Sequence, residues 1–403
     1  MKYRRALLAL VVAATSFVSS LGSSSHLAGA AVQPDDWGEF TPLTPERILD
    51  TRTGTGAAAA NSPVGVGAQI SVQILGRGGV PASGVTAVVM NVTATQSSED
   101  SFLTVFPTGA TRPTASTVNF RRGQSVPNLT VAKVGDGGQI SVYNDSGNTH
   151  VLFDVVGWYS TSSSVGTKSR LRTITPERVL DTRQTGSVGA NASIPLPITG
   201  RAGVPSGATG VVLNITGTNA TAGTFITAYP SDVSLPTASN LNLQPNQSVP
   251  NLAMVRLPAN GQISLYNFAG TTDLVVDVVG YYDRIYSDTS GQVMAMTPSR
   301  KVDTRLTNQP LGPDGVAVMQ FSGIGGVILN VTVTGGTEGS FLTVFPATNG
   351  EATTLPTASN LNFVAGQTVA NLVTVKVPPS GVVAFYNYRG NVHVVVDVVA
   401  IVS

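Results

Sequence analysis

The chain repeats one ordered series of short motifs three times, and this triplication limits what it can fold into. Each copy opens with Thr-Pro-x-Arg and Asp-Thr-Arg and closes with Asp-Val-Val. The closing aspartate recurs after 123 residues, from Asp154 to Asp277, and after 120 more, at Asp397. This period is the size of a domain and far exceeds the roughly 20 to 50 residues of a solenoid or propeller unit. We therefore expect three copies of one domain.

The residue pattern inside each copy predicts β-strands. Short runs of Val, Ile, Thr, Phe and Tyr alternate with Gly, Pro, Asn and Asp, and no amphipathic helix is evident. In the first copy the expected strands are 68–75, 85–94, 101–107, 115–120, 127–134, 138–144 and 149–158. Seven or eight strands in about 120 residues predict an all-β fold, with three tandem antiparallel β-sandwich domains of jelly-roll or Greek-key type.

The first 30 residues have the composition of an export signal. Lys2, Arg4 and Arg5 precede the apolar run 6–18, and Ala-Gly-Ala at 28–30 fits a cleavage site. We expect a secreted, extracellular or cell-wall-associated protein, with both the general and the twin-arginine export routes open. No later stretch reaches the roughly 18 apolar residues of a membrane helix. The predicted division is a signal peptide at 1–30, repeats at 31–160, 173–283 and 293–403, and linkers at 161–172 and 284–292.

The charge balance narrows the range of partners. Without the signal region the chain has 20 Lys and Arg against 22 Asp and Glu, and charged residues make up only 11% of the chain. Nucleic acids and anionic membranes are bound by clustered Lys and Arg, so neither is an expected partner. The chain has no Cys, so its stability must come from buried side chains rather than from disulfides.

The last strand of each copy carries one carboxylate between apolar residues on both faces, as in Val-Leu-Phe-Asp-Val-Val around Asp154. A buried carboxylate needs a partner, and an arginine can bind it through two parallel hydrogen bonds. Arg52 of Asp-Thr-Arg is the expected partner of Asp154, and Arg47 is also expected to lie near this carboxylate. The predicted structural cluster comprises Asp50, Arg52, Asp154, Asp181, Arg183, Asp277, Asp303, Arg305 and Asp397.

Alternation along the closing strand places His150, Leu152, Asp154, Val156 and Trp158 on one face. The equivalent faces of the other copies contain Asp277 and Asp397. If the copies pack around a pseudo-threefold axis, these strands are candidates to line it. Copies arranged like beads on a string would contradict that packing.

Residues for catalysis are scarce. The chain after residue 30 has two His, His150 and His393, which lie in different copies, so no zinc site is expected. The only acids present in every copy are those of Asp-Thr-Arg and Asp-Val-Val, and an ion pair with Arg accounts for each. We therefore expect no enzyme activity, no cofactor and no catalytic residue.

Two groups of recurring residues allow a binding interpretation and a structural one. Asparagines recur at 119, 128 and 144, at 242, 251 and 267, and at 362, 371 and 387. Their amides either present hydrogen bonds to a sugar or satisfy backbone groups at strand ends, and the second interpretation is favoured. Aromatic residues close the first two copies, and these candidate glycan contacts are Trp158, Tyr159, Tyr281 and Tyr282. Covering the junction between copies is the favoured alternative for them.

These motifs in combination resemble an actinobacterial family of secreted β-repeats. Its marks are Leu-Asp-Thr-Arg, Asn-x-Thr, Ser-x-x-Asn-Phe, Gln-x-Val-x-Asn-Leu and Asp-Val-Val-Gly-Tyr-Tyr, and the match covers roughly residues 41–403. The third copy departs with Ser299, Lys301 and Ala400-Ile401-Val402. The resemblance implies non-catalytic modules that accompany secreted enzymes or occur alone, and it implies no catalytic residue.

The leading functional prediction is a secreted, non-enzymatic protein of the cell envelope or extracellular matrix that acts by surface association or assembly, self-association included. The alternative is a carbohydrate-binding protein for cell-wall or environmental polysaccharide. Exposed aromatic side chains near Trp158 or Tyr281 would favour the alternative.

Overall fold

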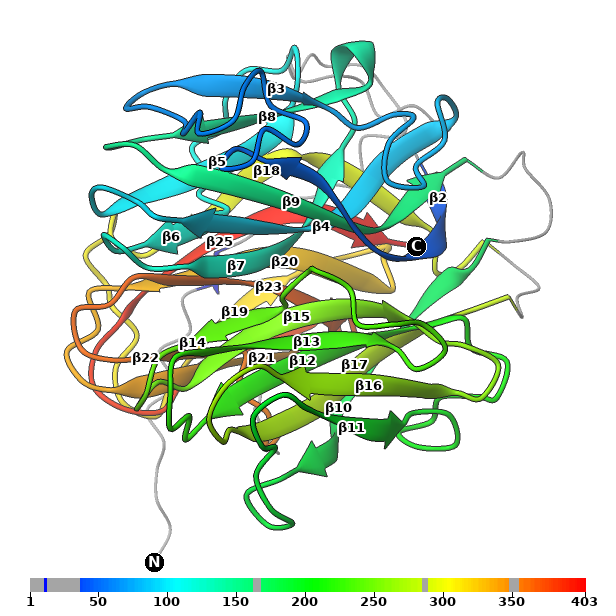
Figure 1. Cartoon of the computed structure of the whole chain (residues 1–403). Coiled ribbons are helices and arrows are strands. Elements are labelled where there is room, and N and C mark those ends of the chain that lie inside the picture. The colour runs from blue at the N-terminus through cyan, green and yellow to red at the C-terminus, as the bar shows by residue number, and fades with distance from the viewer. Residues whose placement is uncertain (1–10, 13–36, 162–167, 285–288, 348–354) are drawn as a thin grey trace, which may run out of the picture.

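The computed structural model describes residues 11–12, 37–161, 168–284, 289–347 and 355–403 (Figure 1). These residues form β-strands joined by turns, with a single-turn 3-10 helix at Asp136–Gly138. Within these ranges, no helix has the length and apolar character needed to cross a bilayer. The expectation of an all-β chain of antiparallel sheets is confirmed. Apart from residues 11–12, the predicted signal peptide lies outside the described residues.

The first repeat forms two four-stranded antiparallel sheets. Its strands are β2 (Trp37–Asp50), β3 (Gln69–Gln73), β4 (Val85–Thr95), β5 (Ser101–Pro107), β6 (Val118–Phe120), β7 (Val126–Lys133), β8 (Gln139–Asn144) and β9 (His150–Ser160). One sheet has the order β2-β9-β4-β7 and the other the order β3-β8-β5-β6. Counted within the repeat, these orders are 1-8-3-6 and 2-7-4-5, which is the connectivity of an eight-stranded jelly roll.

The second and third repeats use the same two strand orders. The second contains β10 (Arg170–Asp181), β11 (Ala192–Pro197), β12 (Gly210–Thr218), β13 (Thr224–Pro230), β14 (Leu241–Leu243), β15 (Val249–Arg256), β16 (Gln262–Asn267) and β17 (Asp273–Asp283). The third contains β18 (Val293–Asp303), β19 (Gly315–Gln320), β20 (Gly326–Thr334), β21 (Ser340–Pro346), β22 (Leu361–Phe363), β23 (Val369–Lys376), β24 (Val382–Asn387) and β25 (His393–Val402). The two-residue strand β1 (Val11–Val12) pairs in parallel with β19.

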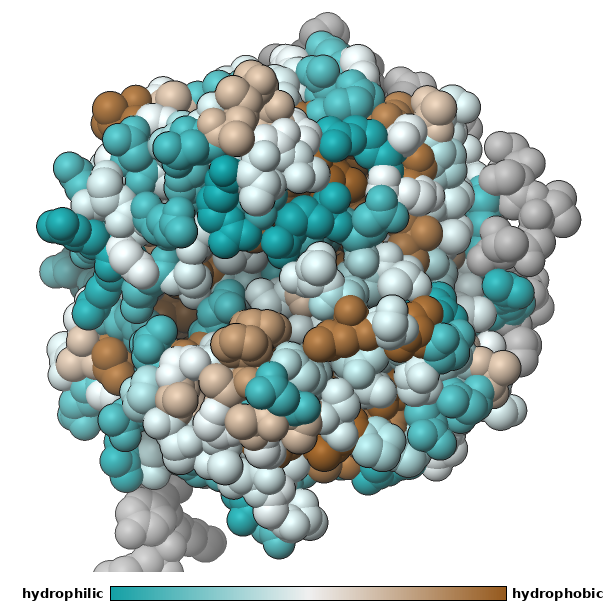
Figure 2. Space-filling view, viewed as in Figure 1, coloured by the Kyte–Doolittle hydropathy of each residue, from teal (hydrophilic) through white to brown (hydrophobic). Residues whose placement is uncertain are grey.

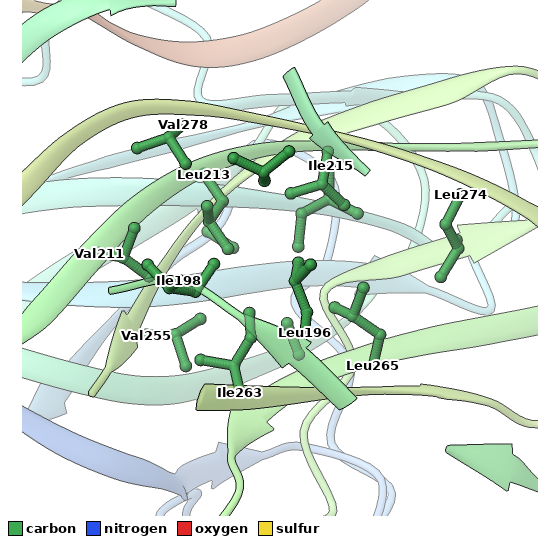
Figure 3. Close-up of a cluster of buried hydrophobic side chains, with 14 of the residues drawn as sticks. Leu196, Ile198, Val211, Leu213, Ile215, Val255, Ile263, Leu265, Leu274 and Val278 are labelled. Atoms are coloured by element: carbon green, nitrogen blue, oxygen red, sulfur yellow. The ribbon is translucent and has the colours of Figure 1, made fainter. Parts of the chain in front are cut away.

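Each repeat buries its own apolar core between its two sheets. In the second repeat, Leu196 of β11 and Ile198, just after that strand, pack in one cluster with Leu213 and Ile215 of β12, and all four are less than 3% exposed (Figure 3). Equivalent clusters fill the first and third repeats. Apolar side chains from the facing surfaces of the two sheets produce these cores, as expected for packed sheets.

A fourth apolar cluster joins the three repeats. It contains Val156, Val279 and Val399 from the three closing strands, together with Tyr159 and Tyr282. The Tyr159 and Tyr282 hydroxyls lie 2.5 Å apart, and both side chains are fully buried. The repeats are therefore packed against one another rather than arranged like beads, with the first repeat above the second in Figure 1.

Two features tie the first strands of the repeats to their neighbours. Strand β18 of the third repeat pairs with β2 of the first at Val293 and Met294, so two four-stranded sheets merge into one of eight strands. The Phe40 ring packs 4.2 Å from the Tyr282 ring, measured between ring centroids. A side chain at Gly157 would come within 2.3 Å of the Phe40 ring, so glycine is required at this position.

A β-bulge changes the side-chain alternation of the closing strand. In the pairing of β4 with β9, Val89 lies opposite Gly157 and Met90 opposite Val155, so Val156 is the extra residue. Residues after the bulge consequently face the opposite way: Tyr159 enters the cluster between repeats, whereas Trp158 packs against the core of its own repeat. The prediction that Trp158 shares a face with Asp154 is therefore wrong.

Seven strands of the first repeat lie where the sequence predicted them, and one further strand, β2, precedes them. The expected strands correspond to β3 through β9, with ends displaced by up to three residues. Strand β2 was not predicted, because its Thr-Pro-Glu-Arg segment is polar and contains proline. Strand β10 begins at Arg170, inside the predicted linker 161–172, whose residues 162–167 lie outside the described part.

Candidate functional site

The aspartate of each closing strand is paired with an arginine of the opening motif. Arg47 donates to Asp154 from Nε at 2.8 Å and from Nη2 at 3.0 Å, so both carboxylate oxygens are engaged. Arg178 binds Asp277 in the same way at 2.9 and 3.3 Å. Arg300 binds Asp397 at 2.9 and 3.1 Å. This geometry is bidentate in all three repeats.

The direct partner of Asp154 is thus Arg47 and not Arg52. Arg47 lies opposite Asp154 in the pairing of β2 with β9, whereas Arg52 follows the end of β2. Arg52 instead binds Asp50 of its own motif, with Nε to Oδ1 at 2.9 Å and Nη2 to Oδ2 at 2.7 Å. A further contact of 3.5 Å joins Arg47 to Asp50, so the predicted residues do form one cluster.

The same two-part cluster recurs in the other repeats. Arg183 binds Asp181 at 2.8 and 2.5 Å, and Arg305 binds Asp303 at 2.8 and 2.6 Å. Burial raises the pKa of Asp154, Asp277 and Asp397, and the paired arginines oppose that shift. The hydrogen bond from Arg305 holds the pKa of Asp303 below its usual value.

These arginines also reach the next repeat. Arg47 Nη2 donates to the carbonyl oxygen of Thr237 at 3.3 Å, and Arg178 Nη2 donates to that of Thr357 at 2.9 Å. Both acceptors lie in a Pro-Thr-Ala-Ser motif, whose role was not recognised from the sequence. The recurrence of this motif in all three copies was the available signal. The backbone carbonyl oxygens of this motif accept hydrogen bonds from arginine side chains of the neighbouring repeat.

Buried asparagines extend these contacts in a closed cycle. Asn91 donates to the Ser239 carbonyl oxygen at 2.7 Å, Asn214 to that of Ser359 at 2.8 Å, and Asn330 to that of Ser116 at 2.6 Å. The first repeat therefore contacts the second, the second contacts the third, and the third returns to the first.

A second set of asparagines follows the same cycle. The backbone N–H of Leu129 donates to Asn251 Oδ1 at 3.3 Å, that of Leu252 to Asn371 at 3.1 Å, and that of Leu372 to Asn128 at 3.0 Å. All three asparagines are at most 1% exposed. Buried amides that are fully hydrogen-bonded specify one arrangement, because any other would leave polar groups unpaired.

The recurring asparagines therefore divide into three roles. Asn128, Asn251 and Asn371 bridge repeats and are inaccessible to a sugar. Asn144 Nδ2 lies within 3.2 Å of four carbonyl oxygens, Asn387 Nδ2 within 3.1 Å of four, and Asn267 Nδ2 within 3.1 Å of three, all in the same repeat. For these two groups the structural interpretation is confirmed. Asn119, Asn242 and Asn362 differ, because they line a cavity.

Two of the four predicted aromatic contacts for a glycan are buried, and the other two are partly buried. Tyr159 is 1% exposed and Tyr282 is completely buried. Trp158 and Tyr281 are partly buried and pack against the cores of their own repeats. Their placement at the junctions and cores favours the structural interpretation, and the prediction of glycan contacts at Tyr159 and Tyr282 is wrong.

An open cavity of about 690 Å³ lies where the three repeats meet. We call it the inter-repeat cavity. The segments that precede β7, β15 and β23 form its wall, near the labels β6, β14 and β22 in Figure 1. Its volume falls in the range of roughly 300 to 1,000 Å³ typical of ligand sites.

Equivalent polar residues from all three repeats line the inter-repeat cavity. They are Asn119, Asn242 and Asn362, Gln124, Gln247 and Gln367, and Ser125, Ser248 and Thr368. Each glutamine accepts a backbone N–H through its Oε1, for example that of Arg121 at 3.0 Å. Because that oxygen is engaged, the wall is held in place before any ligand arrives.

The charges of the inter-repeat cavity do not follow the threefold pattern. Arg121 and Arg122 come from the first repeat and Arg389 from the third, and the lining contains no Asp or Glu among the described residues. Outside the lining, Asp100 accepts the backbone N–H of Arg122 at 2.8 Å. The cavity therefore carries a net positive charge.

No cluster of three or more His, Cys, Asp or Glu suited to a metal ion occurs in the described ranges.

Polar and neutral residues cover most of the face seen in Figure 2, with separate apolar patches between them. The exposed aromatic side chains include Phe268 and Tyr388, which lie on equivalent turns after β16 and β24.

Comparisons with known proteins leave the family open. No family model matches the chain, and no curated protein matches it. Among solved structures, a chain from an archaeal virus described for its triple jelly-roll fold and turret assembly matches at 12% identity and a TM-score of 0.18. The match covers 90% of both chains. A chain of Sulfolobus turreted icosahedral virus matches with the same identity and TM-score. Likeness at this level carries no argument about this chain.

Proposed function

We propose that this protein is a secreted, non-enzymatic β-domain protein of the cell envelope or extracellular space that acts by associating with a surface. In this proposal the three repeats are three tandem sandwich domains related by pseudo-threefold symmetry. The observation that carries it is the closed cycle of buried contacts, in which Asn91, Asn214 and Asn330 each bind the following repeat. Such a ring is rigid and presents all three repeats in one fixed arrangement.

The use of the recurring acids supports a non-catalytic role. A glycosidase needs two carboxylates about 5 to 10 Å apart that are free to transfer protons or attack the sugar. Here Asp154 and Asp50 each accept two hydrogen bonds from an arginine side chain, and both are at most 2% exposed. The acids that every repeat shares therefore stabilise the fold.

The experiment is a sedimentation assay with purified cell wall and insoluble polysaccharides. A chain beginning at Trp37 should be retained by at least one of these materials, with no release of soluble sugar or peptide. Heat-unfolded chain is the control for non-specific adsorption. Release of reducing ends or peptides would overturn the non-enzymatic assignment, and no retention on any surface would overturn association.

A second candidate function is carbohydrate binding, favoured by one specific observation. Asn119, Asn242 and Asn362, one from each repeat, line the inter-repeat cavity. Amides suit sugar hydroxyls because each can both donate and accept hydrogen bonds. Saturable binding of a soluble oligosaccharide, abolished by Asn242→Ala, would support this candidate. Surface retention without any binding of soluble sugars would leave only the first.

A further inference from the structure

We propose that the inter-repeat cavity binds an anionic sugar unit, with a carboxylated sugar as its ligand class. This inference rests on the carbohydrate-binding candidate above and specifies its ligand. Its basis is the way in which the lining departs from threefold equivalence. Positions 121, 244 and 364 hold Arg, Gln and Val, and positions 122, 245 and 365 hold Arg, Pro and Ala. The ring itself therefore does not require arginine at either position.

The arginines have hydrogen-bonding capacity to spare. Arg121 Nη2 donates to the Gly366 carbonyl oxygen at 3.1 Å, which links the first repeat to the third and orients the side chain. A guanidinium has five N–H donors in a planar fork that matches a carboxylate. In the described part of the chain neither Arg121 nor Arg122 pairs its side chain with an acid. A ligand carboxylate would supply the missing negative charge.

An aromatic platform lies beside the third arginine. The Phe341 and Tyr388 rings are stacked, with centroids 4.9 Å apart and an interplanar angle of 17°, and both line the cavity. Tyr388 is 38% exposed. Arg389 lies over the Tyr388 ring, 4.8 Å from its centroid, and donates to its hydroxyl at 3.2 Å. The exposed part of the Tyr388 ring can contact the apolar part of a sugar, while the guanidinium beside it binds the acidic group.

The second repeat provides a matched control. Phe225 and Phe268 form a nearly identical stack, with centroids 4.7 Å apart and an interplanar angle of 14°. Phe268 is 47% exposed, but neither ring lines the inter-repeat cavity. Ala269 stands where the third repeat has Arg389. If aromatic exposure alone determined binding, Phe268 and Tyr388 would both bind the ligand. The proposal assigns the ligand to Tyr388 alone.

The ligand is a sugar rather than a bare anion or a nucleic acid. Amides and hydroxyls from three repeats surround the arginines, and an inorganic anion would leave most of them unused. The chain after residue 30 has a small net negative charge, which disfavours a polyanion that needs long stretches of positive surface. One acidic sugar unit with flanking neutral hydroxyls uses the arginines, the amides and the aromatic platform together.

The test is calorimetric titration of the chain beginning at Trp37 with tri-galacturonate and with its methyl ester, which is uncharged. Tri-galacturonate should bind at least tenfold more tightly than the ester, and its binding should weaken as salt is raised. The variant Arg121→Gln/Arg122→Ala/Arg389→Ala should lose at least tenfold in affinity for the acid. Each replacement is a residue that another repeat already carries at that position, and an unchanged melting temperature confirms folding. Tyr388→Ala should weaken binding, and Phe268→Ala should not.

The outcomes separate the two proposals. Equal binding of acid and ester that is lost in Asn242→Ala would overturn the anionic specificity and keep carbohydrate binding. No binding of either sugar would overturn both the inference and the carbohydrate-binding candidate. Competition by inorganic phosphate as strong as that by free galacturonate would show that the cavity recognises a bare anion, which contradicts an anionic sugar as ligand.

Discussion

Replacing Asn251 by leucine removes one connection of the ring and keeps the number and branching of the side-chain heavy atoms. Its Nδ2 donates to the Asn240 carbonyl oxygen at 2.7 Å and to Asn91 Oδ1 at 3.2 Å, and its Oδ1 accepts the Leu129 N–H at 3.3 Å. The residue is 1% exposed, so water does not replace these bonds. Each buried polar group left without a partner costs about 1 to 3 kcal/mol. Three such groups predict a loss of about 3 to 9 kcal/mol in the free energy of unfolding.

Guanidinium denaturation followed by tryptophan fluorescence measures this loss, with linear extrapolation to zero denaturant. The control is Asn260→Leu, because Asn260 makes hydrogen bonds to Ser231 and to the Gln262 N–H but is exposed. Water can take over those bonds, so the control should lose less than about 1 kcal/mol. A loss for Asn251→Leu no larger than that of the control would refute the argument that buried amides hold the repeats together.

A double-mutant cycle then tests whether the loss comes from contact between repeats. Asn91 belongs to the first repeat and Asn251 to the second, and their side chains are hydrogen-bonded. The losses from Asn91→Leu and Asn251→Leu should fail to add by at least about 0.5 kcal/mol. Strict additivity would mean that the two amides act only within their own repeats.

Three further changes test the ion pairs and the shared core. Arg178→Met leaves the buried Asp277 without its partner and should lower the free energy of unfolding by about 3 to 5 kcal/mol. Arg256→Met breaks an exposed pair with Asp232 and should lower it by less than about 1 kcal/mol. Similar losses for the two variants would contradict the role of burial. Burial raises the pKa of Tyr159, so Tyr159→Phe should leave the native absorbance titration up to pH 12 unchanged; the loss of one ionising tyrosine in that range would contradict the burial of Tyr159. The hydrogen bond from Arg305 lowers the pKa of Asp303, so the unfolded chain binds more protons there and stability is lost as pH falls below about 4. Asp303→Asn should reduce that loss in the free energy of unfolding. An unchanged dependence of stability on pH would argue against the Asp303–Arg305 pair.

Much of the fold could be predicted from the sequence because period and alternation are local properties. The carboxylate in an apolar strand predicted an arginine partner, since a buried charge must be compensated. The choice of Arg47 over Arg52 depends on the register between β2 and β9, which the sequence alone does not reveal. The bulge at Val156 likewise reverses the faces of the residues that follow, so Trp158 was assigned to the wrong side.

The candidate site was less accessible to sequence reasoning than the fold. Repetition drew attention to Asn128 and Asn144, which proved to be structural. The charged residues of the inter-repeat cavity do not repeat: Arg121 and Arg389 occur in one copy each at their positions. They meet only because three distant turns converge, which is a property of the packing between repeats. The charged residues of the proposed binding site therefore lie where the three copies differ.

Small-angle X-ray scattering of the chain beginning at Trp37 tests the closed packing of the three repeats most directly. A compact body of this length has a radius of gyration of about 21 Å. We predict a measured radius within about 3 Å of that value and independent of salt concentration. Three domains of about 120 residues arranged like beads would give a radius of about 30 Å or more. A measured radius near the larger value would contradict the shared core of Tyr159 and Tyr282 and, with it, the existence of the inter-repeat cavity.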